Sequence, residues 1–76
     1  MKMRAFTLRG TVCRFTLRDG LRKQSALHAI GTNLSSAYKR NFRSTYRIVQ
    51  RSPVFYTVRD KETGKLIMLV EKEKEA

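Results

Sequence analysis

Residues 54–70 read VFYTVRDKETGKLIMLV. Two runs of β-branched, aromatic and aliphatic residues flank a polar segment that ends in glycine, and this pattern predicts a β-hairpin. If Asp60 lies opposite Lys65, then Tyr56 faces Leu69, and both faces of the hairpin are fairly apolar. We therefore expect this hairpin in the interior of a sheet, with at least one face under a helix.

Residues 3–18 alternate between apolar and polar side chains, which predicts a second hairpin with its turn around Arg9-Gly10. An even number of loop residues would place five apolar side chains on one face: Phe6, Leu8, Cys13, Phe15 and Leu17. The opposite face would carry Arg9, Arg14, Thr16 and Arg18. A single long bent strand is the alternative, since Arg-Gly is not a preferred pair for a two-residue turn.

After Asp19-Gly20 the period of the pattern changes to that of a helix. The apolar stripe consists of Leu27, Ile30, Leu34, Ala37 and Tyr38. Gly31-Thr32-Asn33 interrupts it with three weak helix formers, which favours a break into two short helices over one helix with a soft point. The break permits a helix-turn-helix as an alternative, with residues 24–30 as the supporting helix and residues 34–42 as the recognition helix.

Strand residues return at 45–50, and a turn at 51–53 leads into the apolar hairpin. The fold class that we predict is α+β. A small antiparallel sheet of four to five strands packs against one helix or a broken pair of short helices. At 76 residues the chain is expected to form a single domain over 1–76, with 71–76 as a charged, frayed tail. The core of such a chain is small, and a homodimer or a bound partner would add to its stability.

Charge is the most informative part of the composition. Seventeen Lys and Arg against six Asp and Glu give a net charge of +11. Residues 1–59 hold thirteen basic side chains and one acid, whereas residues 60–76 hold four basic and five acidic ones. Such a potential destabilises a small domain through self-repulsion, and a polyanionic partner would offset it.

The sequence offers little for catalysis or metal binding. With one His, His28, and one Cys, Cys13, the chain contains no zinc-ligand spacing and no intramolecular disulfide. Its four glycines are isolated, so there is no glycine-rich phosphate loop. We expect no cofactor, no metal and no enzymatic activity. No apolar run reaches the length of a membrane span and no secretory signal is visible, so a cytoplasmic location without membrane attachment is expected.

The basic residues form two groups in the sequence, and together they are the nine predicted nucleic-acid-binding residues. The N-terminal cluster is Arg14, Arg18, Arg22 and Lys23, and the central cluster is Lys39, Arg40, Arg43, Arg47 and Arg51. Arginine predominates, which favours bidentate phosphate contacts. The leading interpretation is a small, non-enzymatic protein that binds DNA or RNA.

Two other interpretations remain open at the level of sequence. The first is a small regulator or inhibitor that binds an acidic surface of another protein, with Phe42, Phe55 and Tyr56 as candidate apolar anchors. The second follows from a resemblance: the runs at 46–49, 54–58 and 66–70 resemble the sheet of ribosome-dependent mRNA-cleaving toxins of the RelE type. That resemblance covers about a third of the chain. It implies roles for Arg47, Tyr56 and Arg59, although glutamates follow the last run, where that family has a basic or histidine-bearing segment.

Overall fold

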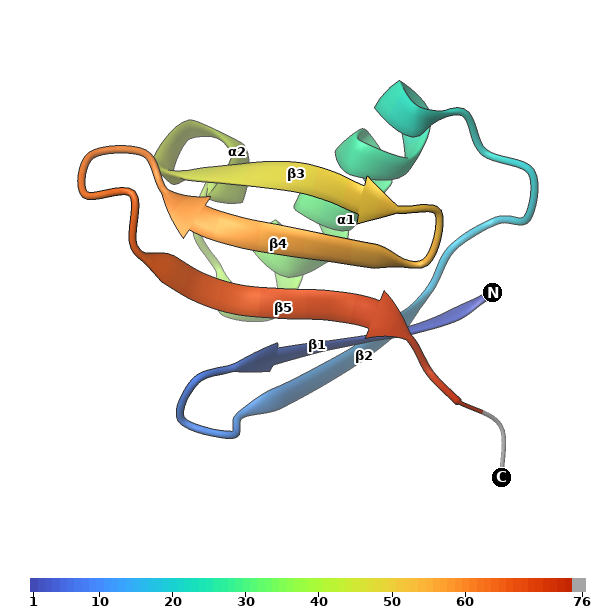
Figure 1. Cartoon of the computed structure of the whole chain (residues 1–76), viewed down its shortest axis with the longest axis horizontal. Coiled ribbons are helices and arrows are strands. Elements are labelled where there is room, and N and C mark those ends of the chain that lie inside the picture. The colour runs from blue at the N-terminus through green and yellow to red at the C-terminus, as the bar shows by residue number, and fades with distance from the viewer. Residues whose placement is uncertain (75–76) are drawn as a thin grey trace.

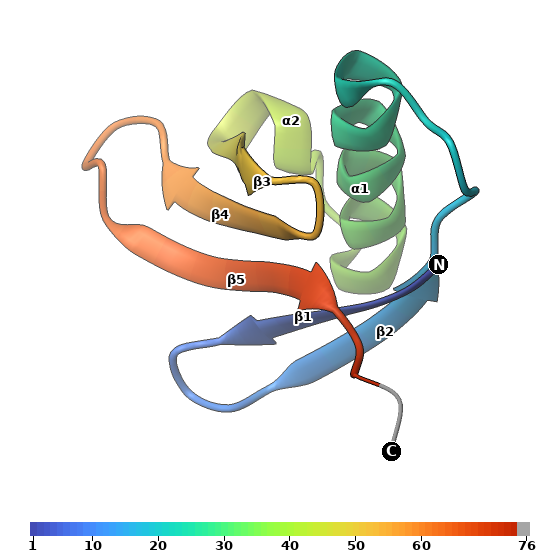
Figure 2. The ribbon, with the colours of Figure 1, turned by 45° about the vertical axis from the view of Figure 1, so that its right-hand side comes forward.

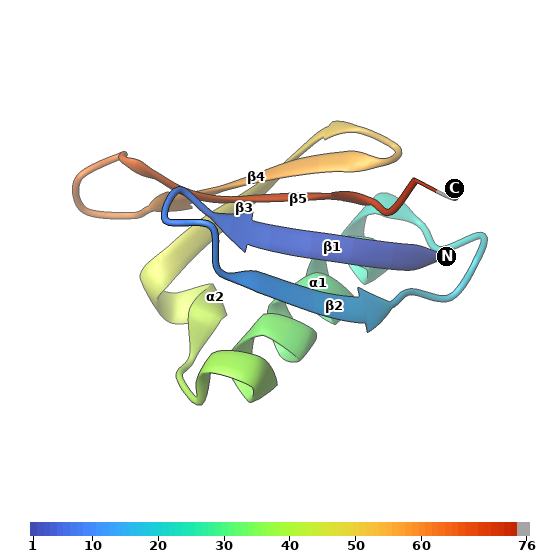
Figure 3. The same cartoon turned by 90° about the horizontal axis from the view of Figure 1, so that it is seen from below.

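Five strands form one antiparallel sheet in the order β2-β1-β5-β4-β3 in the computed structural model, which describes residues 1–74 (Figure 1). In chain order the elements are β1 (Lys2–Thr7), β2 (Val12–Thr16), α1 (Lys23–Tyr38), α2 (Phe42–Thr45), β3 (Tyr46–Ser52), β4 (Phe55–Asp60) and β5 (Leu66–Lys72). Both helices lie on the same side of the sheet (Figure 3). The predicted α+β class is confirmed, with five strands, one long helix and one short helix.

The sheet consists of two parts that are joined in its middle. Strands β1 and β2 form an N-terminal hairpin, and strands β3, β4 and β5 form a meander. The antiparallel pairing of β1 with β5, in which Phe6 lies opposite Leu69, unites them. The 54–70 hairpin is therefore interior to the sheet, as its two apolar faces predict.

The core lies between the sheet and α1, which lies behind the strands in Figure 1 and stands upright beside them in Figure 2. Ala26, Ile30 and Leu34 recur at four-residue intervals along α1, so they share one face, and all three are buried. The sheet contributes these buried side chains: Met3, Ala5, Tyr56, Val58, Met68 and Val70. Burial of this single stripe against a single sheet face is what fixes the helix on the sheet.

Helix α1 runs without a break through Gly31, Thr32 and Asn33, so the favoured pair of short helices is wrong. The Thr32 hydroxyl donates to the carbonyl of His28 at 3.0 Å, and the Asn33 side-chain amide donates to the carbonyl of Ala29 at 2.8 Å. Both side chains bond to the preceding turn of the same helix, and packing of its apolar stripe overrides their weak helix propensity.

The chain instead leaves the helix at Lys39, which adopts the left-handed conformation with φ of 52°. The helix-turn-helix alternative is also wrong. Residues 24–30, the proposed supporting helix, and residues 34–38, the first part of the proposed recognition helix, belong to the same continuous helix α1.

The register of the β4-β5 hairpin departs from the expected one by a single residue. Near the loop it is as predicted, because the Asp60 amide donates to the Lys65 carbonyl at 3.0 Å. A register shift next to Val58 then places Tyr56 opposite Val70 instead of Leu69. An extra residue in one strand is a β-bulge, and here it rotates Val70 onto the buried face beside Tyr56.

The β1-β2 hairpin is confirmed, but its loop has three residues, 8–10, and not an even number. Gly10 has φ of +90°, the conformation that a three-residue hairpin loop requires at its last position. The odd loop length places Phe6 opposite Val12, so Phe6 lies on the face opposite Cys13 and Phe15. The predicted grouping of five apolar side chains on one face is therefore wrong for the residues before the turn.

The first part of the predicted frayed tail pairs with the sheet. Glu71 and Lys72 belong to β5, and the amide of Glu73 donates to the carbonyl of Lys2 at 2.9 Å. Residues 75 and 76, the end of that prediction, lie outside the described residues.

We expect truncation of Ile30 to destabilise the fold, because its side chain is fully buried between α1 and the sheet. Ile30→Val should lower the free energy of unfolding by about 0.5–1.5 kcal/mol and Ile30→Ala by about 2–5 kcal/mol. Urea unfolding measures both changes. Leu8→Ala is the control, since Leu8 is 71% exposed and should change stability by less than about 0.5 kcal/mol. Equal effects at the two positions would contradict the described core.

Candidate nucleic-acid interface

An open hollow of about 240 Å³ lies where α1, α2, β3 and the β4-β5 loop meet. Its lining residues are Gln24, Leu27, His28, Arg43, Tyr46, Arg47, Ile48 and Lys61. Three of them are permanently cationic at neutral pH, and none of these lining residues is acidic. We call this feature the basic hollow.

Helix α2 supports one side of the basic hollow and is anchored to α1 by its first residue. The amide of Phe42 donates to the Ser35 hydroxyl at 2.9 Å. The buried Phe42 ring packs between the rings of Tyr38 and Tyr46, at centroid distances of 5.5 and 4.7 Å. Asn41 caps the helix by accepting from the amide of Ser44. Arg43, the next residue after Phe42, is therefore held against α1.

Arg43 packs across α1 at Gly31. A Cβ atom at Gly31 would lie 2.7 Å from Cγ and 2.9 Å from Cδ of Arg43, so only glycine leaves room for this side chain. Beyond that contact, Nη1 of Arg43 lies 2.7 Å from Nδ1 of His28. Because the guanidinium is always a donor, Nδ1 must accept, which places the proton of the neutral imidazole on Nε2.

Lys61 approaches the basic hollow from the β4-β5 loop. Its Nζ donates to the carbonyl of Arg43 at 2.6 Å, and its amide donates to the carbonyl of Thr45 at 3.2 Å. The preceding Asp60 carboxylate orders the loop by accepting from the amides of Thr63 and Glu62, at 3.0 and 2.8 Å. These two hydrogen bonds lower the pKa of Asp60, because they favour its charged form.

The structure does not bring all of the central cluster together. Arg43 and Arg47 line the basic hollow, and Arg40 lies next to it with Nη1 donating to the Tyr46 hydroxyl at 3.1 Å. Lys39 is exposed at the C-terminal end of α1. Arg51 lies near the far end of β3, where its Nε donates to the Thr57 hydroxyl at 3.3 Å.

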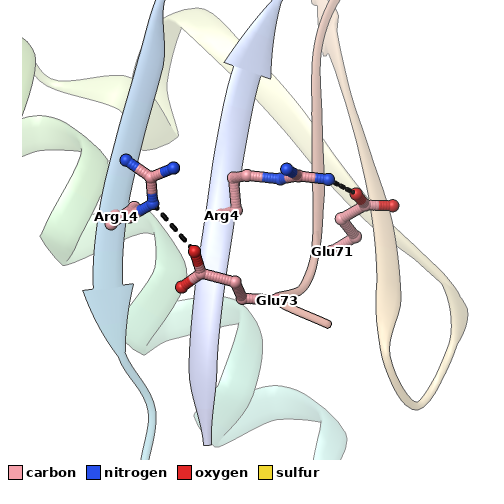
Figure 4. Close-up of polar contacts among 4 residues, drawn as sticks. All are labelled: Arg4, Arg14, Glu71 and Glu73. Atoms are coloured by element: carbon pink, nitrogen blue, oxygen red, sulfur yellow. Dashed lines mark hydrogen bonds and ion pairs between the residues drawn. The ribbon is translucent and has the colours of Figure 1, made fainter. Parts of the chain in front are cut away.

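No residue of the N-terminal cluster lines the basic hollow. Arg14, on β2, pairs with Glu73 at 2.9 Å, and the neighbouring Arg4 pairs with Glu71 (Figure 4). Arg18 and Arg22 are exposed in the connection between β2 and α1, and Lys23 is the first residue of α1.

Three polar lining residues were not among the nine predicted ones: Gln24, His28 and Lys61. Gln24 and His28 are four residues apart on α1, a spacing that places them on one helix face. This placement could have been predicted from the sequence, since both residues lie beside the apolar stripe of the helix. The position of Lys61 could not, because a lysine in a polar turn is ordinary.

The positions implied by the resemblance to RelE-type toxins do not line one cavity. Arg47 lines the basic hollow. Tyr56, in contrast, is 1% exposed in the core, where its hydroxyl accepts from the side-chain amide of Gln50 at 3.4 Å. Arg59 donates to the carbonyl of Gly64 at 3.0 Å.

No cluster of three or more metal-ligating side chains occurs within residues 1–74. The longest helix in that part of the chain, α1, is too short and too polar to cross a membrane, and so is α2. Comparison of the chain with protein-family models, curated proteins and solved structures gave no match.

The packing of Arg43 on Gly31 predicts a coupling between the two residues. In the Arg43→Ala background, Gly31→Ala should raise the free energy of unfolding by about 1 kcal/mol, because alanine is the better helix former. With Arg43 present the same change should bring little gain or a loss, since the new Cβ displaces the arginine. A double-mutant cycle by urea unfolding measures the difference. The same gain in both backgrounds would show that Arg43 does not pack at this position.

Proposed function

We propose that the protein is a small, non-enzymatic nucleic-acid-binding protein whose basic hollow holds backbone phosphates. The observation that carries the proposal is the convergence of Arg43, Arg47 and Lys61 on one hollow whose lining contains no acidic side chain. These residues come from three separate elements, α2, β3 and the β4-β5 loop. The tertiary fold therefore adds Lys61, which is remote in the sequence, to two arginines of the central cluster.

The side chains around the basic hollow have donors to spare for an anion. A guanidinium has five N–H donors, and Arg43 uses Nη1 toward His28. A lysine ammonium has three donors, and Lys61 uses one toward the carbonyl of Arg43. The remaining donors suit the oxygens of a phosphate, for which arginine offers paired, charge-assisted hydrogen bonds.

Repulsion between one cation of the basic hollow and a neighbouring arginine adds to the preference for a polyanion. Arg47 lies directly opposite Arg59 in the β3-β4 ladder, an arrangement of like charges that destabilises a sheet. A phosphate chain along this edge of the sheet would offset that repulsion and the field of the whole chain, with its net charge of +11.

The alternative of an acidic protein partner has less support at the basic hollow. Of its three candidate anchors, Phe42 and Tyr56 are 3% and 1% exposed and belong to the core. Phe55 is partly exposed but does not line the basic hollow. A protein interface needs an accessible apolar anchor beside its charges, and neither buried ring supplies one.

Removing two cations from the basic hollow should weaken binding to nucleic acid. For Arg43→Ala with Arg47→Ala we expect the Kd for a DNA duplex, a DNA single strand or an RNA hairpin to rise about tenfold or more. The slope of log K against log salt should become shallower by about 2, because two phosphate contacts are lost. Fluorescence anisotropy across a salt series measures both quantities and shows which of the three nucleic acids is preferred.

The matched control is Arg18→Ala with Arg22→Ala, which removes the same charge from exposed positions outside the basic hollow. It should lower the affinity less. Equal losses in the two double variants would mean that binding depends on net charge and not on the basic hollow. Absence of binding by the wild-type protein at low salt would overturn the proposal.

A further inference from the structure

Strands β3 and β4 carry three arginines on the sheet face that the helices leave uncovered. Val58 of β4 is buried on the helix side, so its neighbours Thr57 and Arg59 belong to the other face. Arg47 lies directly opposite Arg59 in the β3-β4 ladder and shares that face. Arg51 also lies there, because its Nε donates to the Thr57 hydroxyl at 3.3 Å. Helices α1 and α2 lie on the opposite side (Figure 3). We call these three arginines the arginine face.

No carboxylate offsets the charge of the arginine face. None of the three ion pairs within residues 1–74 includes one of its arginines. Asp60, the residue after Arg59, directs its carboxylate to two amides of the β4-β5 loop. Arg51 uses only Nε and Arg59 only Nη1 in hydrogen bonds with the protein. Their other donors remain for the oxygens of a phosphate.

The acids at the end of β5 limit this basic area on one side. Glu71 in β5 pairs with Arg4, and Glu73, just after β5, pairs with Arg14 (Figure 4). Strand β5 lies on the far side of β4 from β3. The two carboxylates repel phosphates, so a phosphate chain on this face would follow β3 and β4.

Arg47 joins the arginine face to the basic hollow. It lines the basic hollow together with residues of α1 and α2, and it also pairs with Arg59 on the uncovered face. Strand β3 is the edge of the sheet, so a bound chain can pass around it from one side of the sheet to the other. Arg51 lies four residues further along β3, about 13 Å away at the usual rise per strand residue. The cations therefore form one path from Lys61 and Arg43 to Arg51.

The bend in this path determines which nucleic acid fits it. Duplex DNA has a persistence length of about 50 nm, so it resists a turn around one edge strand of a molecule whose shortest extent is 23 Å. The helices offer little for a groove, since α2 has four residues and Lys23 is the only lysine or arginine of α1. Building on the proposed function, we propose that the ligand is a single-stranded nucleic acid whose backbone runs from the basic hollow around β3 onto the arginine face.

Phe55 offers a platform for a base at the far end of this path. Its ring is partly exposed, and it lies two residues before Thr57, on the same face of β4. Glu71, its neighbour across the β4-β5 ladder, is already neutralised by Arg4. Exposed aromatic rings on a sheet stack the bases of single strands, whereas the bases of a duplex are stacked on one another.

Fluorescence anisotropy with a single strand and a duplex of about 12 nucleotides, each as DNA and as RNA, tests the proposal. We expect the wild-type protein to bind a single strand about tenfold more tightly than the duplex. Arg51→Gln with Arg59→Gln removes both charges and keeps an amide donor at each position. It should weaken single-strand binding about tenfold or more, and duplex binding less than about twofold. Its slope of log K against log salt for the single strand should become shallower by about 1.4.

Two further variants complete the test. Arg18→Gln with Arg22→Gln makes the same charge change at exposed positions outside the path, and should weaken single-strand binding less. Phe55→Leu keeps an apolar side chain and removes the ring, so it should weaken single-strand binding about fivefold or more. Circular dichroism verifies folding, and Phe55→Leu carries the test if the Arg51→Gln, Arg59→Gln variant does not fold.

The outcomes separate this proposal from the proposed function. A duplex bound as tightly as the single strands would overturn the single-stranded path, and so would equal losses in the two glutamine double variants. In either case the basic hollow would still be the binding site if Arg43→Ala with Arg47→Ala weakens binding. Absence of binding to every probe by the wild-type protein at low salt would overturn both proposals.

Discussion

The antiparallel pairing of β1 with β5 is the constraint on which the rest of the structure depends. It joins a hairpin from the start of the chain to a meander from its second half, and so completes the face on which α1 packs. It also sets the distribution of charge, because it brings Glu71 and Glu73 next to Arg4 and Arg14. Acids near the end of the chain thereby neutralise arginines near its beginning, and the basic hollow remains without a carboxylate in its lining.

The basic hollow depends in turn on the contact between α1 and α2. A glycine in the middle of a helix costs helix propensity, and here Gly31 is the position that admits Arg43. The same three-residue segment that suggests a helix break from the sequence is therefore a packing site in the structure. Arg43 then connects His28 on one side with Lys61 on the other, so three elements hold one group of cations together.

Much of the fold could be predicted from local pattern. Alternation and apolar runs indicated both hairpins, and the stripe through Ile30 and Leu34 indicated the helix. The details that were missed depend on single residues. One bulged residue beside Val58 shifts the register of β4 against β5. One extra loop residue before Thr11 places Phe6 on the opposite face of the sheet from the predicted one. For the candidate site, the sequence identified Arg43 and Arg47, but the approach of Lys61 is a product of tertiary structure that no spacing reports.

The measurement that tests the account most directly is a titration of ¹⁵N-labelled protein with the preferred nucleic acid, followed amide by amide by NMR. If phosphates bind in the basic hollow, the largest shift changes should fall on His28, Arg43, Arg47 and Lys61, and they should diminish as salt is added. The amides of Phe6 and Leu69, which pair in the centre of the sheet outside the basic hollow, should change little. Shift changes centred on Phe6 and Leu69, with the basic hollow unaffected, would contradict the account.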